Sequence, residues 1–143
     1  MQKLLTLDSN IFISETKGNE KYSDKCSDII SRVGSDFLLV EPTVLLAEIG
    51  NAVGRNVSIK SGANRVIEVE NIVSWFTTCD KEFCKKAGIT GAQYRVYSTD
   101  SLYMQTAFDS YTILVSLDED EFILKLKDKN LPIEVYHPRE FPY

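Results

Sequence analysis

The chain has 143 residues, of which 43% are hydrophobic and 26% charged. This composition excludes a disordered or fibrous protein and allows one α/β domain over residues 1–143 with its own core. No apolar run approaches the roughly 20 residues of a membrane-spanning helix. The charge of Asp8 comes too early for a secretory signal. We therefore expect a cytoplasmic protein without a membrane partner.

The charge and the metal-binding residue types narrow the possible functions further. The net charge of −5 comes from 16 basic and 21 acidic residues, which argues against a protein that grips nucleic acid tightly by phosphate contacts alone. Cys26, Cys79 and Cys84 lack the spacing of a zinc site, and His137 is the single histidine. Cysteine–histidine metal chemistry is thus excluded, whereas a carboxylate metal site would account for part of the excess acid.

The first half of the chain predicts two strands and three helices. An apolar run from Lys3 predicts a buried strand that ends at the turn-forming Asp8, and 14–20 resembles a loop. The remaining elements expected here are a helix at about 21–33, a strand at 37–42, and helices at about 43–56 and 61–76. Pro42 suits the start of the helix that follows the second strand.

The second half continues the alternation of strands and helices. Gly88 and Gly91 indicate a loop after a weaker helix. The elements expected are an extended piece at 78–81, helices at about 82–87 and 99–109, a strand at 112–117, a helix at 118–129 and a strand at 132–136. Because the strands are nearly all apolar and alternate with helices, they predict a parallel sheet of four to five strands with helices on both faces, a three-layer α/β/α domain.

Four acidic residues stand where acids are unexpected. Asp8 and Asp118 each follow a strand at its carboxyl end, where open α/β sheets bind ligands. Glu48 lies among apolar residues of a helix, and Asp100 opens another. Each has a simpler explanation: the three aspartates as helix N-caps, and Glu48 as a solvent-facing side chain. Together, four carboxylates at one locus would repel each other unless cations neutralised them, which favours Mg²⁺ or Mn²⁺ bound by oxygen ligands.

Four short motifs in register resemble the PIN-domain family, and most of all the VapC-type toxin ribonucleases. They are the N-terminal LDSNIFI, the PTVLLAE helix, the segment STDSLYMQTA and the element LVSLD, which together cover Lys3 to about Val135. The resemblance implies that Asp8, Glu48, Asp100 and Asp118 bind the metal. Three further residues would support them, namely Asn10 as the partner of Asp8, Ser116 within the cluster, and Asp120 as a further acid. Leu117 departs from the basic or polar residue that many members carry.

The function implied is metal-dependent hydrolysis of RNA phosphodiester bonds, by the toxin of a toxin–antitoxin pair that forms a homodimer. The residues themselves leave two other readings open: a Mg²⁺-dependent phosphatase on a doubly wound sheet, and a non-catalytic PIN-like binding module. Basic and aromatic side chains near the acids are either substrate contacts or ordinary surface residues, and the apolar residues of 44–57 and 59–76 either core or an association surface. The basic and aromatic candidates are Arg55, Lys60, Arg65, Lys85, Lys86, Arg95, Tyr94 and Tyr97.

Overall fold

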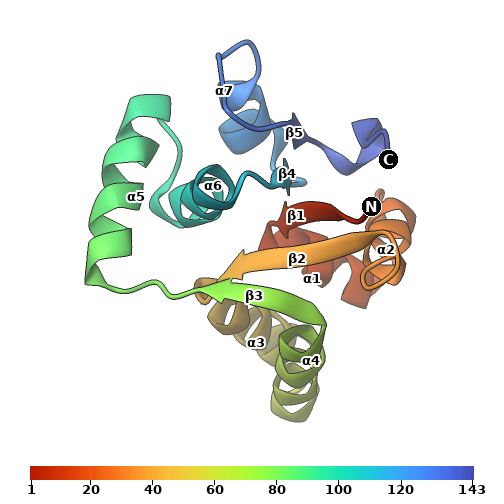
Figure 1. Cartoon of the computed structure of the whole chain (residues 1–143). Helices are drawn as coiled ribbons and strands as arrows, with labels where there is room; N and C mark the ends of the chain where they lie inside the picture. Colours follow the sequence, from red (N-terminus) through yellow and green to blue (C-terminus); the bar gives the residue numbers. More distant parts are fainter.

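The computed structural model describes residues 1–143 as a five-stranded parallel sheet flanked by helices (Figure 1). The strand order is β3-β2-β1-β4-β5. The strands are β1 (Lys3–Leu7), β2 (Phe37–Pro42), β3 (Val73–Thr77), β4 (Ile113–Val115) and β5 (Val135–Tyr136). The predicted α/β class, and its upper estimate of five parallel strands, are confirmed.

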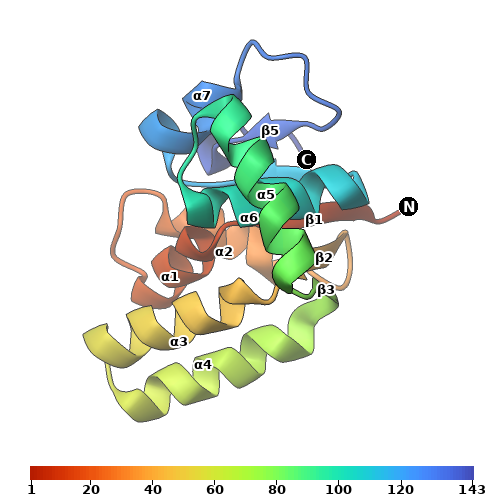
Figure 2. The same ribbon diagram turned by 90° about the vertical axis from the view of Figure 1, so that its left-hand side faces the viewer.

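Helices cover the sheet in two groups. The helix α6 (Ser98–Ser110) packs against β1, β2 and β4, and α5 (Lys81–Tyr94) packs on α6. The helices α1 (Ser9–Lys17) and α3 (Val44–Asn56) lie behind the sheet in Figure 1, where α1 also contacts α2 (Ser23–Ser31). The helix α4 (Ile59–Ile72) pairs with α3 as a helical hairpin, which is plain in Figure 2. No helix is long and apolar enough to cross a membrane.

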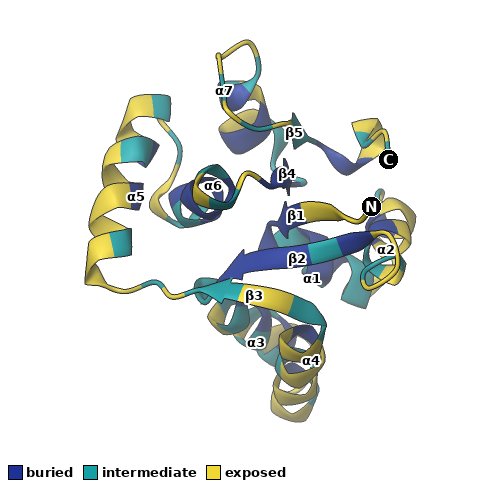
Figure 3. Cartoon of the chain, viewed as in Figure 1, coloured by how far each residue is buried: buried dark blue, intermediate teal, exposed yellow.

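The core lies between the central strands and these helices. Leu5, Leu39 and Val115 of the central strands are fully buried, as are Phe12 of α1 and Tyr103 of α6. Figure 3 shows β2 largely buried and the middle of the edge strand β3 exposed. All three cysteines are free, so the core is held without disulfides.

The element limits differ from the sequence prediction at four places. Residues 9–17 form α1, although 14–20 was expected to be a loop. The predicted helix 61–76 ends at Ile72, because residues 73–77 pair with β2 as the edge strand β3. The predicted strands 112–117 and 132–136 are shorter in the structure. The predicted helix 118–129 is a π-helical turn at Glu119–Ile123 followed by α7 (Leu124–Leu126). A short 3-10 turn, η2 (Pro138–Glu140), closes the chain.

The loop predicted at Gly88 and Gly91 is wrong, because α5 continues through both glycines. A Cβ at Gly91 would lie 2.6 Å from the Cβ of Ser101, so this glycine permits the close approach of α5 to α6. Asp80 begins α5 by accepting a hydrogen bond from the N–H of Phe83 (2.9 Å). Tertiary contact with α6 thus outweighs the low helix propensity of glycine.

Candidate active site

Asp8 lies directly after β1, at the carboxyl end of the sheet. The Ser116 hydroxyl donates a hydrogen bond to its Oδ2 (2.7 Å), and the Asn10 amide approaches the same oxygen (3.2 Å). Asn10 in turn accepts a hydrogen bond from the N–H of Leu117 (3.1 Å). Asp8 makes no capping hydrogen bond to α1, so the N-cap explanation does not describe its side chain. These contacts join the ends of β1 and β4 and fix the Asp8 carboxyl group.

The environment of Asp8 disfavours its charged form. The pKa of Asp8 is raised to about 6, mainly by burial and also by the negative charges of Glu48 and Asp118, while the hydrogen bond from Ser116 opposes the shift. Asp8 is 5% exposed, so solvent does little to offset this repulsion. A cation beside this carboxylate would relieve it.

Asp100 lies in the first turn of α6 and is half-buried. Burial raises the pKa of Asp100 to about 7, with further contributions from the charges of Asp8, Asp118 and Glu48, opposed by Lys125. Because α6 begins at Ser98 with Tyr97 as its N-cap residue, Asp100 is not the cap. The four predicted acids therefore share one region, although each belongs to a different segment of the chain.

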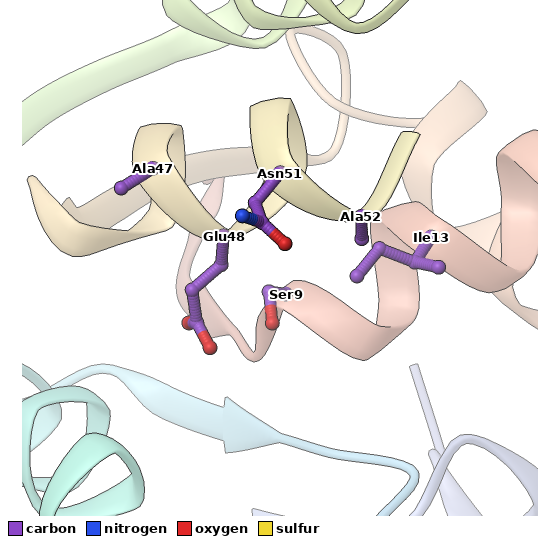
Figure 4. A pocket seen from close by; sticks show the side chains of 6 residues that line it. All are labelled: Ser9, Ile13, Ala47, Glu48, Asn51 and Ala52. Carbon is purple, nitrogen blue, oxygen red and sulfur yellow. The ribbon is translucent and has the colours of Figure 1, made fainter. Parts of the chain in front are cut away.

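Glu48 projects from the middle of α3 toward α1. Its Oε1 accepts a hydrogen bond from the Tyr103 hydroxyl (2.5 Å), which links α3 to α6. Glu48 and Asn51 face Ser9 across a hollow of about 360 Å³ between α3 and α1 (Figure 4). Half-buried and hydrogen-bonded, Glu48 is not a free solvent-facing side chain.

Asp118 caps the π-helical turn, as its simpler explanation held. Its Oδ1 accepts a hydrogen bond from the N–H of Glu121 (3.1 Å), which leaves Oδ2 available. Its own N–H donates to the Ser116 hydroxyl (3.1 Å). Asp120, predicted as a supporting acid, is exposed and makes no side-chain hydrogen bond. No hydrogen bond therefore ties Asp120 to the cluster.

The acidic cluster does not form a complete set of metal ligands in this structure. No three acidic, histidine or cysteine side chains are arranged so that they could hold a metal ion. The donor chemistry nevertheless fits a hard divalent cation, because the converging groups are carboxylates that repel one another. The types of ligand suit Mg²⁺ or Mn²⁺, whereas their observed positions are not those of a finished coordination shell.

The sequence prediction missed one buried acid, Glu41. It is fully buried at the end of β2, where its Oε1 accepts a hydrogen bond from the N–H of Leu7 (2.7 Å). Its Oε2 is buried without a partner. Burial raises the pKa of Glu41 well above its usual value, and the charge of Asp8 adds to the effect. The available signal was a lone acid in the otherwise apolar strand FLLVEP.

Three of the six predicted basic contacts form ion pairs elsewhere. Arg65 pairs with Glu15 and Glu68, Lys85 with Glu82, and Lys86 with Asp109. Tyr94 packs edge-on against Phe108. The basic side chain whose charge acts on the cluster is Lys125, which the sequence prediction did not single out.

Comparison with solved structures places this architecture among known folds. VapC20 from Mycobacterium tuberculosis, a toxin that cleaves the sarcin-ricin loop, is similar with a TM-score of 0.68 and 7% identity, covering 82% of this chain and 92% of that chain. A chain of VapBC-1 from nontypeable Haemophilus influenzae gives 0.67 and 13%, covering 96% and 99%. A chain of VapBC2 from Rickettsia felis, bound to a promoter DNA fragment, gives 0.66 and 12%, covering 94% and 98%.

No protein-family model and no curated protein sequence matches the chain. At 7% to 13% identity, the structural likeness shows the fold. The structural match covers nearly the whole length of this chain and of the chains compared, in agreement with the resemblance drawn from the four sequence motifs. The chain therefore has the PIN-domain fold of the VapC-type toxins.

Proposed function

We propose that the chain is a Mg²⁺- or Mn²⁺-dependent endoribonuclease and the toxin of a toxin–antitoxin pair. The observation that carries this proposal is the grouping of Asp8, Glu48, Asp100 and Asp118, whose charges act on one another at the carboxyl end of the sheet. Burial and the neighbouring charges raise the pKa values of Asp8 and Asp100, and carboxylates in such surroundings are suited to binding cations.

Four acidic residues of the chain would bind the cation, and their neighbours would position them. Asp8, fixed by Ser116 and Asn10, would be the central ligand, and Asp100 and Asp118 would complete the shell with Glu48. When bound, the cation supplies an activated water and neutralises charge on the phosphate. The hydrogen bond from Tyr103 orients Glu48, and that from Ser116 orients Asp8, so both carboxylates face the cluster with little freedom.

The first test is cleavage of a mixed, end-labelled RNA pool by the purified full chain with Mg²⁺, Mn²⁺ or EDTA. We expect metal-dependent cleavage that falls by about 1,000-fold in Asp8→Asn, since metal-ligand loss removes several kcal/mol of transition-state stabilisation. Asp120→Asn is the matched control, because Asp120 is an exposed acid outside the cluster. It should cleave as the wild type does.

Other outcomes would favour the rival functions. Hydrolysis of a small phosphomonoester without RNA cleavage would support the phosphatase. A folded, partner-free protein that binds Mg²⁺ and cleaves no RNA would support the non-catalytic module. Metal-dependent cleavage by Asp8→Asn at the wild-type rate would remove the assigned cluster from the reaction.

A protein partner and a homodimer are part of the proposal. Several of the similar solved structures are toxin–antitoxin complexes. In this chain the apolar side chains of Val57, Ile59, Ile67 and Trp75 are each more than half exposed. They would be covered by an antitoxin or a second copy of the chain. Light scattering of the purified chain, alone and after co-expression with the product of an adjacent gene, measures both assemblies.

A further inference from the structure

Basic side chains gather around one hollow near the acidic cluster. The hollow, of about 580 Å³, lies between the end of α5 and the α7 turn. We call it the basic groove; the charged residues that line it are Arg95, Lys125, Lys127, Asp128 and Lys129. Four of the chain's 16 basic residues thus meet at one place in a protein whose net charge is −5. This local excess of positive charge contrasts with the negative net charge of the chain.

Two of these cations are free to bind a ligand. Arg95 and Lys129 are exposed and make no ion pair. Lys127 pairs with Glu140 (2.8 Å), and Lys125 pairs with Glu121 (2.7 Å). The charges of these two lysines are therefore largely offset by the glutamates, which leaves Arg95 and Lys129 as the basic side chains open to a ligand.

Lys125 joins the basic groove to the candidate active site. Its Nζ donates a hydrogen bond to the backbone oxygen of Arg95 (2.8 Å) and lies 5.5 Å from the centre of the Tyr97 ring. Tyr97 directly precedes α6, whose first turn carries Asp100. Lys125 also pairs with Glu121, whose backbone N–H donates a hydrogen bond to Asp118, so direct contacts link the groove to the acidic cluster.

We propose that the basic groove binds the sugar–phosphate backbone of single-stranded RNA beside the bond that is cut. This inference rests on the proposed ribonuclease function. Arg95 and Lys129 contact phosphates, and the Tyr97 ring, 64% exposed, offers a face on which an unpaired base stacks. The aromatic face favours RNA over an acidic peptide, because it adds a contact that bases make and carboxylates do not.

The test measures binding rather than cleavage. The full chain in EDTA, where metal-dependent cutting stops, is titrated against a labelled single-stranded RNA of mixed sequence at several salt concentrations. The double variant Arg95→Gln/Lys129→Gln is compared with Lys25→Gln/Lys81→Gln, which removes two exposed lysines that make no ion pair, one in α2 and one at the start of α5. Glutamine at position 95 keeps a side chain at the positive φ that arginine already adopts.

We expect the groove variant to bind RNA about tenfold more weakly and to lower the salt slope by about 1.4, the value for two lost single-strand phosphate contacts. The control variant should bind as the wild type does. Equal binding by both variants overturns the proposal, as does poly-glutamate binding as tightly as RNA of the same length. Loss of binding in the groove variant alone, in a protein that cleaves nothing with metal, supports the groove and refutes the nuclease.

Discussion

The carboxyl group of Glu41 accepts a hydrogen bond from the backbone N–H of Leu7, with 2.7 Å between Oε1 and N. The ladder between β1 and β2 extends from Lys3↔Phe37 to Leu5↔Leu39 and then stops. Beyond it the Thr6 hydroxyl bonds the Val40 carbonyl (2.7 Å). Side chains thus replace backbone pairing where the two strands approach Asp8.

The first prediction concerns the charge of Glu41. Burial raises the pKa of Glu41 in the folded state, so ionising this side chain lowers the free energy of unfolding. This cost is absent below the unfolded pKa of about 4.3 and grows as the pH rises toward the folded pKa. Glu41→Gln keeps an acceptor for Leu7 and cannot ionise. Urea denaturation should show it about as stable as wild type near pH 4 and more stable at pH 8. Exposed Glu70→Gln should change neither, and a pH-independent loss of stability in Glu41→Gln would contradict the prediction.

The second prediction concerns the acidic cluster without metal. The pKa of Asp8 is raised to about 6 and that of Asp100 to about 7, against about 3.9 in an unfolded chain. The folded state therefore holds more protons between about pH 4 and 7, and stability falls as pH rises through this window. In EDTA, wild type should melt at a lower temperature at pH 8 than at pH 5.

Two comparisons check this explanation. Asp100→Asn should melt above wild type at pH 8 in EDTA by about 3 °C, the effect of roughly 1 kcal/mol in a domain of this size. Mg²⁺ or Mn²⁺ should raise the melting temperature of wild type more than that of Asp100→Asn. If Asp100→Asn has the same pH dependence of the melting temperature as wild type, Asp100 does not cause the loss of stability at high pH.

The third prediction concerns the hydroxyl of Ser116, which donates to Asp8 and accepts from the N–H of Asp118. Ser116→Ala removes both contacts from a fully buried position. We expect RNA cleavage and Mn²⁺ affinity to fall by about 10- to 100-fold, as for other groups that orient metal ligands. Ser116→Thr retains the hydroxyl and should keep most of both. An alanine variant with wild-type Mn²⁺ affinity would refute the positioning role.

The fourth prediction compares two glycines of the same helix. A Cβ at Gly91 meets the Ser101 side chain at 2.6 Å, whereas nothing lies within 4 Å of a Cβ at Gly88. Gly91→Ala should lower the free energy of unfolding by about 1–3 kcal/mol through overpacking. Gly88→Ala should raise it by about 0.5–1 kcal/mol, because alanine favours the helix. Guanidinium unfolding measures both, and equal effects would contradict the packing of α5 on α6.

The sequence by itself determined the α/β class, the parallel sheet, and the positions of Asp8 and Asp118 after strands. Local patterns suffice for these because apolar runs must be buried and the carboxyl ends of parallel strands share one edge. The edge strand β3 escaped prediction because its apolar residues continue the period of α4, and only pairing with β2 makes it extended. Gly91 was misread because its role is a contact with Ser101 on another helix.

Tertiary structure alone decided which other residues surround the four predicted acids. The sequence named Asp118 as a ligand and Asp120 as a supporting acid. In the structure Asp118 is half-buried and its charge acts on Asp8 and Asp100, whereas Asp120 is exposed to solvent. Glu41, Tyr103 and Lys125 join the site through contacts across 34, 55 and 30 residues. Such partners come together only when the chain folds, because burial and charge proximity depend on distance in space and not on spacing along the sequence.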